Sequence, residues 1–473
     1  MCEAFNSHFC TIGARLESEL PASSVDPLSY ISYYNTESLT LNPVTPLECS
    51  RIISSLKNTK QDFNVIPVKL IKVFKTKISV IFSDIVNCCF AAGVFPSIYK
   101  DAIAIALYKN KGSKLDVLNF RSISLLLTFS KIIEKCLNSR INKFISDHNI
   151  LNPHQFGFRA GFSTEHAVSE FCEYIYDSLN KKYHTVSVFI DLQKAYDTID
   201  RDILLRKLKL YGIRGTPLNL ISSFLSNRTQ RVRVDGVLSD KLNIPIGLPT
   251  GSVLSCLLFL LYINDLPQLS HLISPILYAD DTTLSFRGPS MEELSELCNG
   301  ELEKFSVWTE ANRLSINAQK TFSIIFSNRS FNNPLLSVKG SSIDNRQFGK
   351  FLGITVDSNL NFNEHISVTA SKISKSIGVL YKLKPYLPTE TLVTIYYSLV
   401  HPYLNYCSMV WGNSSPSSVK PLVMLQKKCI RIICKVSYLA HTSPLFKRLN
   451  ILKFQDISNL KLALYAYRNR GEI

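Results

Sequence analysis

The chain has 473 residues, of which 46% are apolar, and it carries a formal net charge of +16. This apolar fraction excludes wholesale disorder, and the length predicts roughly two to four compact units, or one enzyme body with an added lobe. Residues 366–473 hold 15 Lys and Arg against 3 Asp and Glu, a net charge of +12, whereas the first 365 residues contribute only +4. We therefore expect a polyanionic partner, nucleic acid or a membrane surface, held by the last quarter of the chain.

No segment has the pattern of a membrane span or a secretory signal. The longest apolar run, residues 253–263, is far shorter than the ~20 residues that cross a bilayer, and the N-terminus lacks a basic stretch followed by an apolar one. The 12 cysteines are scattered, and the close pairs Cys88–Cys89 and Cys429–Cys434 do not have the spacing of zinc ligands. The sequence indicates an intracellular protein with reduced, mostly buried thiols.

Helices are predicted to dominate both ends of the chain, while strands and helices alternate in the middle. In chain order, the apolar patterns predict helices over most of 1–90, a strand over 102–108, a helix over 131–148, a buried strand over 186–192, a helix over 203–211, a strand–turn–strand over 276–286 and several basic amphipathic helices from 366 onward. Gly212 stands where a C-terminal helix cap belongs, and Ser290 with Glu293 forms a capping box that opens another helix.

Three carboxylates stand at the ends of apolar strands. Asp191 follows residues 186–190, and Asp280 with Asp281 occupies the tip between the two strands of 276–286. Buried carboxylates are unfavourable without cations. A pair of Mg²⁺ ions about 4 Å apart would meet that need and would lower the pKa of a hydroxyl nucleophile. For the two adjacent Asp alone, an Asp-rich hairpin turn is the plainer interpretation, since Asp is favoured in turns.

Three further features favour the metal site. Tyr196 lies five residues after Asp191, where its ring can sit under a bound sugar. The Gly-rich turn 247–252 leads into an apolar helix, and its backbone can approach a base pair closely because glycine has no side chain. Lys320 follows the helix that Ser290 opens and is a candidate donor to a leaving phosphate.

These residues, in this order, resemble a reverse transcriptase of a Jockey-like non-LTR retrotransposon. Any one short match is weak, but the blocks follow the order of that family over about 340 residues. The blocks that carry the resemblance are 96–112 (PSIYKDAIAIALYKNKG), 119–126 (NFRSISLL), 155–164 (QFGFRAGFST), 189–198 (FIDLQKAYDT), 247–265 (GLPTGSVLSCLLFLLYIND), 278–281 (YADD), 308–320, 350–353 (KFLG), and the tail segments 401–406 (HPYLNY), 410–412 (VWG) and 425–433 (LQKKCIRII).

The resemblance implies an α+β right-hand polymerase fold. It divides the chain into an N-terminal helical extension over 1–90, fingers with an antiparallel palm sheet over 91–365, and a basic α-helical thumb over 366–473. It implies an RNA-directed DNA polymerase that copies retrotransposon RNA from a primer 3′-hydroxyl with two Mg²⁺ ions, for which Mn²⁺ can substitute. The implied partners are the RNA template, the DNA primer, dNTPs and the RNA–DNA hybrid, with no membrane. The protein would act as a ribonucleoprotein in the nucleus, the cytoplasm or both. The upstream endonuclease of these elements is expected to be absent from this chain.

The resemblance also implies roles for single residues. The metal ligands would be Asp191, Asp280, Asp281 and the carbonyl of Leu192, and Lys320 would protonate or neutralise pyrophosphate. The residues that would contact the incoming nucleotide are Lys109, Lys111, Arg121, Thr250, Gly251 and Tyr196, the last of which would select deoxynucleotides. Those that would contact template and primer are Gln155, Arg159, Ser163, Thr164, Phe351, Leu352 and Gly353. Those that would contact the hybrid are Lys427, Lys428 and Arg431.

One departure from the family pattern lies in the nucleotide pocket. Thr250 stands where the family usually has Gln, so its contact with the nucleotide is expected to be weaker and the activity lower. A catalytically silent nucleic-acid-binding remnant is therefore an alternative, which retention of Asp191, Asp280 and Asp281 disfavours. An RNase or another Mg²⁺ phosphodiesterase is a third, but Tyr196 has no role in such an enzyme.

Overall fold

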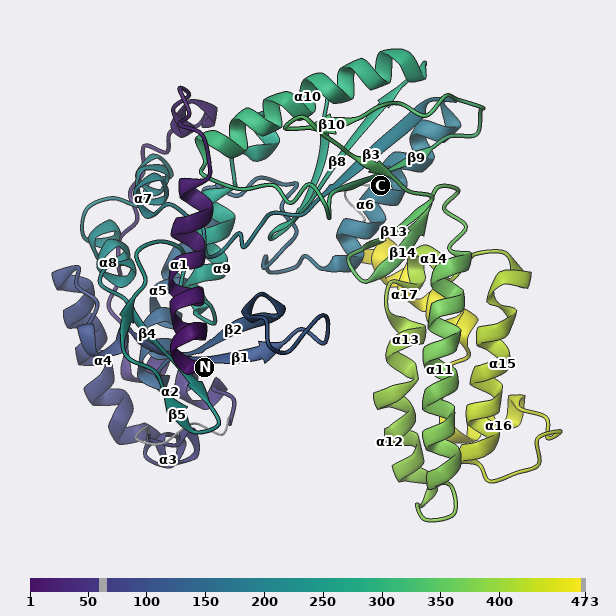
Figure 1. Ribbon diagram of the computed structural model, residues 1–473. Helices are drawn as coiled ribbons and strands as arrows, with labels where there is room; N and C mark the ends of the chain where they lie inside the picture. Colours follow the sequence, from purple (N-terminus) through teal and green to yellow (C-terminus); the bar gives the residue numbers. More distant parts are fainter. Residues whose placement is uncertain (59–65, 469–473) are drawn as a thin grey trace.

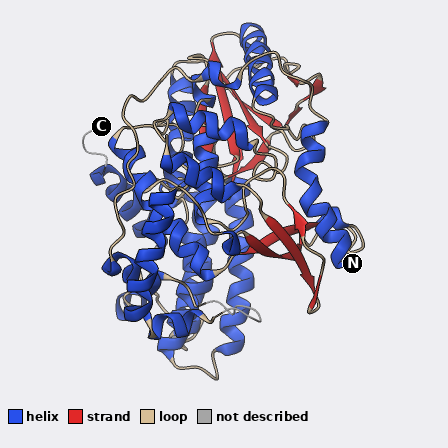
Figure 2. Cartoon of the chain, turned by 90° about the vertical axis from the view of Figure 1, so that its left-hand side faces the viewer, coloured by secondary structure: helices blue, strands red, loops and turns tan. Residues whose placement is uncertain are grey.

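The computed structural model describes residues 1–58 and 66–468, which form a mixed α/β body and a helical lobe at the C-terminal end (Figure 1). Two separate sheets organise the body (Figure 2). The first sheet has the order β2-β1-β4-β5 with β6 on β4, and it is mixed because β1 pairs in parallel with β4 and antiparallel with β2. Its strands are β1 (Asp101–Tyr108), β2 (Phe120–Leu125), β4 (Thr229–Val234), β5 (Val237–Leu238) and β6 (Leu242–Asn243).

The second sheet has the order β12-β9-β3-β8-β7. The prediction of an antiparallel sheet holds for β9, β3, β8 and β7, whereas β12 adds a parallel edge beside β9. Its strands are β3 (His184–Ile190), β7 (Ser274–Tyr278), β8 (Asp281–Gly288), β9 (Phe322–Phe326) and β12 (Asp344–Asn345). Two small hairpins follow, formed by β10 (Ser337–Val338) with β11 (Ser341–Ser342) and by β13 (Phe348–Phe351) with β14 (Ile354–Asp357).

Both faces of the second sheet are covered, which explains why β3 is a continuous apolar run with all of its residues buried. Val186, Val188 and Ile190 belong to one core, and Phe189 belongs to another. The first core also takes in five helices of the body, which are α5 (Thr128–Asp147), α7 (Arg201–Leu210), α8 (Thr216–Leu225), α9 (Val253–Tyr262) and α10 (Met291–Ala311). Helix α6 (Thr164–Asn180) belongs to the second core.

The N-terminal helices pack on the body. Helix α1 crosses β4 and β6, where Phe5 and Phe9 meet Ala104 and Val232 in a small core. Helices α2 and α4 contribute to the first core, so it is continuous from the N-terminal helices to the second sheet. These helices are α1 (Cys2–Ser18), α2 (Pro46–Ser55), α3 (Val68–Val73) and α4 (Lys75–Ala92), and the short 3₁₀ turns are η1 (Pro27–Tyr30), η2 (Ser97–Tyr99), η3 (Val117–Asn119) and η4 (Leu266–Gln268).

The second core runs from α6 through β13 and β14 into the C-terminal lobe, which we define as α11 to α17. The predicted basic helices are confirmed, although the first begins three residues before 366. The last five residues of the predicted range 366–473 lie outside the described part. The helices are α11 (Asn363–Leu383), α12 (Thr389–Leu399), α13 (His401–Asn405), α14 (Ser408–Trp411), α15 (Pro416–Ile433), α16 (Ser443–Leu449) and α17 (Phe454–Arg468).

The other predicted elements are confirmed with small shifts. The strand predicted over 102–108 is β1, the helix over 131–148 is α5, the buried strand is β3, and the strand–turn–strand is β7 with β8. The Ser290 hydroxyl accepts the Glu293 N–H at 3.3 Å, as the capping box predicts, and Gly212 has the left-handed conformation of a helix cap. No helix within 1–58 or 66–468 is both long and apolar enough to cross a membrane.

Candidate active site

The three carboxylates meet at one end of the second sheet because of the register of its strands. Ile190, the last residue of β3, pairs with Thr282 near the start of β8. Asp191 is the residue after Ile190, and Asp281 is the residue before Thr282. The two Asp residues therefore stand opposite each other on adjacent strands. Asp280 lies beside them in the turn between β7 and β8. The sequence prediction that these side chains stand together is supported by this geometry.

Burial and neighbouring negative charge raise the pKa values of Asp280 and Asp281. Burial raises the pKa of Asp281 to about 6, and the negative charges of Asp280 and Asp191 add to the increase. Burial and Asp191 also raise the pKa of Asp280, against a backbone hydrogen bond and the Arg121 guanidinium, which lower it. Among the described residues, no group of three or more His, Cys, Asp or Glu side chains is arranged as a metal site. The carboxylates instead form an open acidic edge.

Asp191 is oriented by the loop after α10. Its Oδ2 accepts from Asn317 Nδ2 at 2.9 Å and lies 3.2 Å from Lys320 Nζ. The backbone is tied as well, because the Asn317 N–H donates to the Asp191 carbonyl at 2.8 Å and Leu192 forms a β-bridge with Ile316. Lys320, expected at the pyrophosphate, therefore lies at the acidic edge with Asp191. The Asn317 contact was not predicted. The only indication in the sequence was that Asn317 lies within the block 308–320.

Cations face this edge from the first sheet and from the segment after β3. Burial lowers the pKa of Lys109, and the charges of Lys194, Arg121 and Lys320 lower it further, so each of these three cations acts on Lys109, whose Nζ donates to the Leu118 carbonyl at 2.6 Å. Arg121 also acts on Asp280, as noted above. Lys111 lies exposed in the turn after β1. Lys194 was not predicted, although its place three residues after Asp191 was a usable signal.

The segment after Asp191 is joined to the turn 247–251. The Tyr196 ring stacks on Phe259 of α9 at 4.6 Å between centroids, and the Leu248 N–H donates to the Tyr196 carbonyl at 2.8 Å. Burial, followed by Cys256 and Asp280, raises the pKa of Tyr196, so its hydroxyl stays neutral. Tyr196 is thus held rigidly beside the acidic edge.

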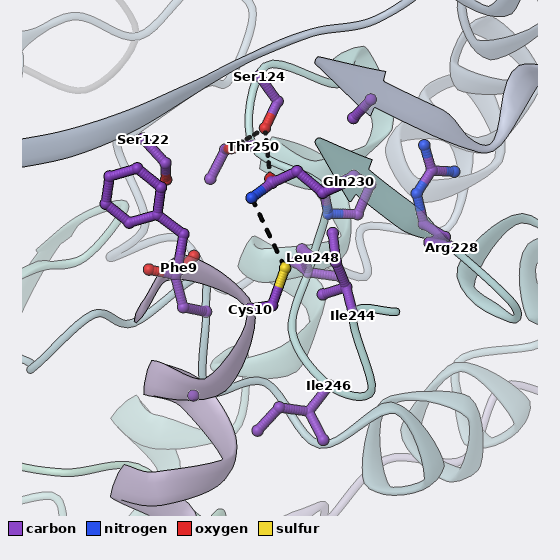
Figure 3. Close-up of a pocket in the computed structure, with 14 residues that line it drawn as sticks. Phe9, Cys10, Ser122, Ser124, Arg228, Gln230, Ile244, Ile246, Leu248 and Thr250 are labelled. Atoms are coloured by element: carbon purple, nitrogen blue, oxygen red, sulfur yellow. Dashed lines mark hydrogen bonds between the residues drawn. The ribbon is translucent and has the colours of Figure 1, made fainter. Parts of the chain in front are cut away.

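The turn 247–251 also packs against β2. The hydroxyls of Thr250 and Ser124 lie 2.8 Å apart. Gly251 has φ +81°, and a Cβ there would lie 2.7 Å from the Ser124 carbonyl oxygen, so the position requires glycine. Figure 3 shows Gln230 between Ser124 and Cys10 of α1, with Phe9 of the same helix beside Ser122, so α1 packs against the pocket that this turn also lines.

A buried carboxylate from α5 supports the same turn. Glu134 Oε2 accepts from the Ser252 hydroxyl at 2.6 Å and from the Val253 N–H at 2.8 Å, and Glu134 Oε1 accepts from the Ser130 hydroxyl at 2.7 Å. Glu134 is fully buried, and together with Ser252 it satisfies the free N–H groups at the start of α9. Glu134 was not predicted, and the only indication in the sequence was an acidic residue between the core positions Ile133 and Cys136.

Two residues of the block 155–164 contact the turn that carries Asp280. Gln155 is 2% exposed, and its Oε1 accepts from the Gly157 N–H at 2.8 Å and the Ala279 N–H at 3.2 Å. Ala279 has φ +56°, a strained conformation for alanine. A Cβ on Gly157 would lie 2.4 Å from the Ala279 nitrogen. Gln155 and Gly157 thereby stabilise the turn that carries Asp280.

The other predicted template residues have partners within the protein. Arg159 Nη1 donates to the Gln155 carbonyl at 3.3 Å, and its guanidinium lies 4.4 Å from the Phe162 ring centre. The Ser163 hydroxyl caps α6 by accepting the His166 N–H, and Thr164, the first residue of that helix, lies near the Tyr406 side chain. These residues form the corner between the second sheet and the lobe.

The turn of the β13–β14 hairpin lies beside the acidic edge. Phe351, Leu352 and Gly353 line a groove of about 320 Å³ together with Asp191, Asp281 and Lys320. Phe351 is buried against Phe171 and Phe189 at 4.8 and 5.6 Å between ring centres. The structure therefore brings the predicted primer-contacting residues to the carboxylates.

The three cations predicted for the hybrid are not part of this groove. Lys427, Lys428 and Arg431 lie on α15, and Arg431 Nε donates to the Ala440 carbonyl at 2.9 Å. Lys428 and Arg431 line another groove, of about 760 Å³, between α11 and α15. In Figure 1, α12 and α13 stand on the side of the lobe toward the first sheet, and α15 stands on the opposite side.

Comparison with known proteins yields consistent matches. The family described as "Reverse transcriptase (RNA-dependent DNA polymerase)" matches residues 109–356. The chain is 28% identical over 433 residues to an RNA-directed DNA polymerase from mobile element jockey of Drosophila melanogaster, covering 89% of this chain and 47% of that protein. It is 27% identical over 451 residues to a probable RNA-directed DNA polymerase from transposon BS of the same fly, covering 90% and 49%. The chain thus spans about half the length of the curated relatives it matches.

Proposed function

Because this chain belongs to the reverse transcriptase (RNA-dependent DNA polymerase) family, we propose that it copies retrotransposon RNA into DNA from a primer 3′-hydroxyl. One observation carries the proposal. Asp191, Asp280 and Asp281 lie at one sheet edge, with a group of cations opposite and the β13–β14 turn in the same groove. Catalysis of phosphoryl transfer depends mainly on positioning the reactants and neutralising their charge, and this arrangement can supply both.

The right-hand description fits the arrangement of the elements. We assign the fingers to the first sheet, the palm to the second sheet and the thumb to the C-terminal lobe, with boundaries near residues 91 and 366. The helices of residues 1–90 precede the fingers, and among them α1 shares a small core with the first sheet, whereas α2 and α4 belong to the first core. A duplex would lie between the lobe and the first sheet, with its growing end at the acidic edge.

Divalent ions fit the donor set of this edge. Carboxylate and carbonyl oxygens are the ligands that Mg²⁺ prefers, and a carboxylate with a raised pKa gains most from a nearby cation. Asp191, Asp280, Asp281 and the Leu192 carbonyl would hold two Mg²⁺ ions, or Mn²⁺ in their place. When bound, such ions activate the attacking hydroxyl and neutralise the leaving pyrophosphate. Asn317 and Lys320 would keep Asp191 oriented before the ions arrive.

The incoming nucleotide would lie between the cations and Tyr196. Arg121 and Lys109 are placed to bind the triphosphate, and Lys111 can reach it from the adjacent turn. The rigid Tyr196 ring would clash with a ribose 2′-hydroxyl and thereby select deoxynucleotides. The turn of Thr250 and Gly251 would border the base pair, and Lys320 would neutralise the pyrophosphate.

The primer end would rest on Phe351, Leu352 and Gly353, in the groove that also holds Asp191 and Asp281. The template would pass the corner formed by Gln155, Arg159, Ser163 and Thr164. The protein would recognise the hybrid by its A-form shape and its phosphates rather than by sequence. Lys427, Lys428 and Arg431 would contact phosphates away from the growing end.

Primer extension tests the proposal. Purified protein would be given an RNA template, an annealed DNA primer, dNTPs and Mg²⁺, with the Asp280→Asn variant alongside. We expect extension by the wild-type chain and a loss of at least about a thousandfold in the variant, because it lacks one charged ligand. Retained hybrid binding by Asp280→Asn would exclude misfolding. Equal extension by both proteins would overturn the assignment of Asp280.

A silent nucleic-acid-binding remnant is the second candidate, and one observation favours it. The Thr250 hydroxyl is engaged with Ser124 rather than free for a nucleotide. Tight hybrid binding without any extension by the wild-type chain would select this function. Faster extension by Thr250→Gln would instead identify Thr250 as the cause of a reduced activity.

A further inference from the structure

Tyr406 connects the C-terminal lobe to the turn of the β13–β14 hairpin. It follows α13, and its hydroxyl donates to the Leu352 carbonyl. Its ring covers the next residue, since a Cβ built on Gly353 would lie 3.2 Å from a ring carbon of Tyr406. Burial raises the pKa of Tyr406 to about 12, so the hydroxyl keeps the proton that it donates. One side chain thus contacts both residues at the tip of the turn.

The turn needs such a contact because its own sequence does not favour its conformation. Phe351 pairs with Ile354, which leaves Leu352 and Gly353 as a two-residue turn. Both residues have positive φ, +44° and +86°. Two-residue hairpin turns of this type favour Asn or Gly at both positions, whereas leucine is disfavoured there by its Cβ. An outside hydrogen bond to the Leu352 carbonyl therefore helps to fix the turn.

Tyr406 is itself held in place by groups from α6 and the lobe. The Tyr406 carbonyl accepts from Trp411 Nε1 at 2.9 Å, and Thr164 of α6 lies near its side chain, where it lowers the pKa of Tyr406. The Cys407 N–H donates to Glu165 Oε1 at 2.9 Å. Glu165 in turn accepts from Lys461 Nζ at 2.6 and 2.8 Å. The Tyr406 ring is thus fixed relative to both the second sheet and the lobe.

We propose that Tyr406 is a positioning residue that sets the place of the Leu352–Gly353 turn relative to Asp191 and Asp281. The inference rests on the proposed polymerase function, because the turn is where the primer end would lie. Tyr406 does not itself line the groove, although it contacts Leu352 and Gly353, which do. It acts through the Leu352 carbonyl, and it links the lobe that clasps the duplex to the turn that aligns the primer 3′-hydroxyl.

The test compares Tyr406→Phe, which removes only the hydroxyl, with Tyr403→Phe as the matched control. Tyr403 lies on the adjacent α13 with a partly exposed ring near Lys372. Extension of a primer on RNA would be measured under single-turnover conditions, with the dNTP concentration varied, beside hybrid affinity and melting temperature. For Tyr406→Phe we expect a roughly tenfold slower maximal rate, as for the loss of one hydrogen bond. We expect KM for dNTP, hybrid affinity and melting temperature to stay at wild-type values.

Each result has a distinct meaning. A wild-type rate in Tyr406→Phe, or a slower rate that appears only together with weaker hybrid binding or lower melting temperature, would overturn the positioning role. An equal effect of Tyr403→Phe would do so too. Absence of extension by the wild-type chain would instead count against the proposed function and would be seen before any variant is compared.

Discussion

Asp191 and Asp281 are far apart in the sequence but adjacent in space, because β3 and β8 pair in the second sheet. Their placement could be predicted from local signals, since each carboxylate adjoins an apolar strand. The contacts of Asp191 could not, because Asn317 and Lys320 arrive through the loop after α10. A sequence pattern identifies a strand end, but it does not identify which loop will cover it.

The raised pKa of Asp281 predicts an unusual dependence of stability on pH. The folded-state pKa is about 6, above the value of about 4 for an unfolded Asp. The folded protein therefore binds the proton more tightly, and the metal-free protein should lose stability as pH rises from about 4 through about 6. Chemical denaturation in the presence of EDTA across this range measures the effect.

Asp281→Asn is the matched variant for this dependence. It removes a charge that Asp280 and Asp191 repel, so we expect the variant to be more stable than the wild type above pH 6 and to have a flatter pH profile. Its polymerase activity should be lost. Parallel stability curves for both proteins would contradict the carboxylate repulsion. Added Mg²⁺ should stabilise the wild type more than the variant at pH 8.

At the scale of elements, the start of α9 depends on a helix distant in sequence. Glu134 of α5 accepts three hydrogen bonds, two of them from Ser252 and Val253. Apolar periodicity predicted α5 correctly, because the period identifies the buried face. It could not predict what that face contacts, so neither Glu134 nor the supporting contacts of Gln155 were found. Buried polar partners depend on tertiary packing, which a local pattern does not contain.

Substitution Glu134→Ala should destabilise the protein by roughly 3 kcal/mol, because buried donors from Ser130, Ser252 and Val253 lose their acceptor. Urea denaturation measures this difference. Asp147→Ala is the matched control, since Asp147 is an exposed acid at the end of the same helix, and it should change stability by less than about 0.5 kcal/mol. Similar losses in the two variants would show that the Glu134 contacts do not support α9.

At the scale of the whole molecule, most of the net charge belongs to the lobe, with +12 of +16 in residues 366–473. The sequence predicted this distribution and the helical character of the lobe. The orientation of α15 could not be predicted, because a basic helix shows the same pattern on whichever side of a lobe it packs. Lys428 and Arg431 lie in the groove between α11 and α15 rather than beside the acidic edge.

Neutralisation of Lys427, Lys428 and Arg431 to Gln should weaken RNA–DNA hybrid binding and reduce the slope of log affinity against log salt by up to about 3. The matched control replaces Lys69, Lys72 and Lys77 on α3 and α4, which removes equal charge from the N-terminal helices. Fluorescence anisotropy at several salt concentrations measures both. An unchanged slope in the α15 variant, or an equal change in the control, would mean that α15 does not contact the duplex.

The Glu165–Lys461 ion pair is one of several attachments between the lobe and the body. The chain enters the lobe from β14 into α11, α17 returns to α6 through this pair, and the second core crosses the same boundary. An appendage joined by its chain alone can swing freely, whereas one joined by a packed core moves only when contacts in that core break. Any opening of the lobe therefore has to break the Glu165–Lys461 pair or shear the second core, so the lobe and the second sheet form one mechanical unit.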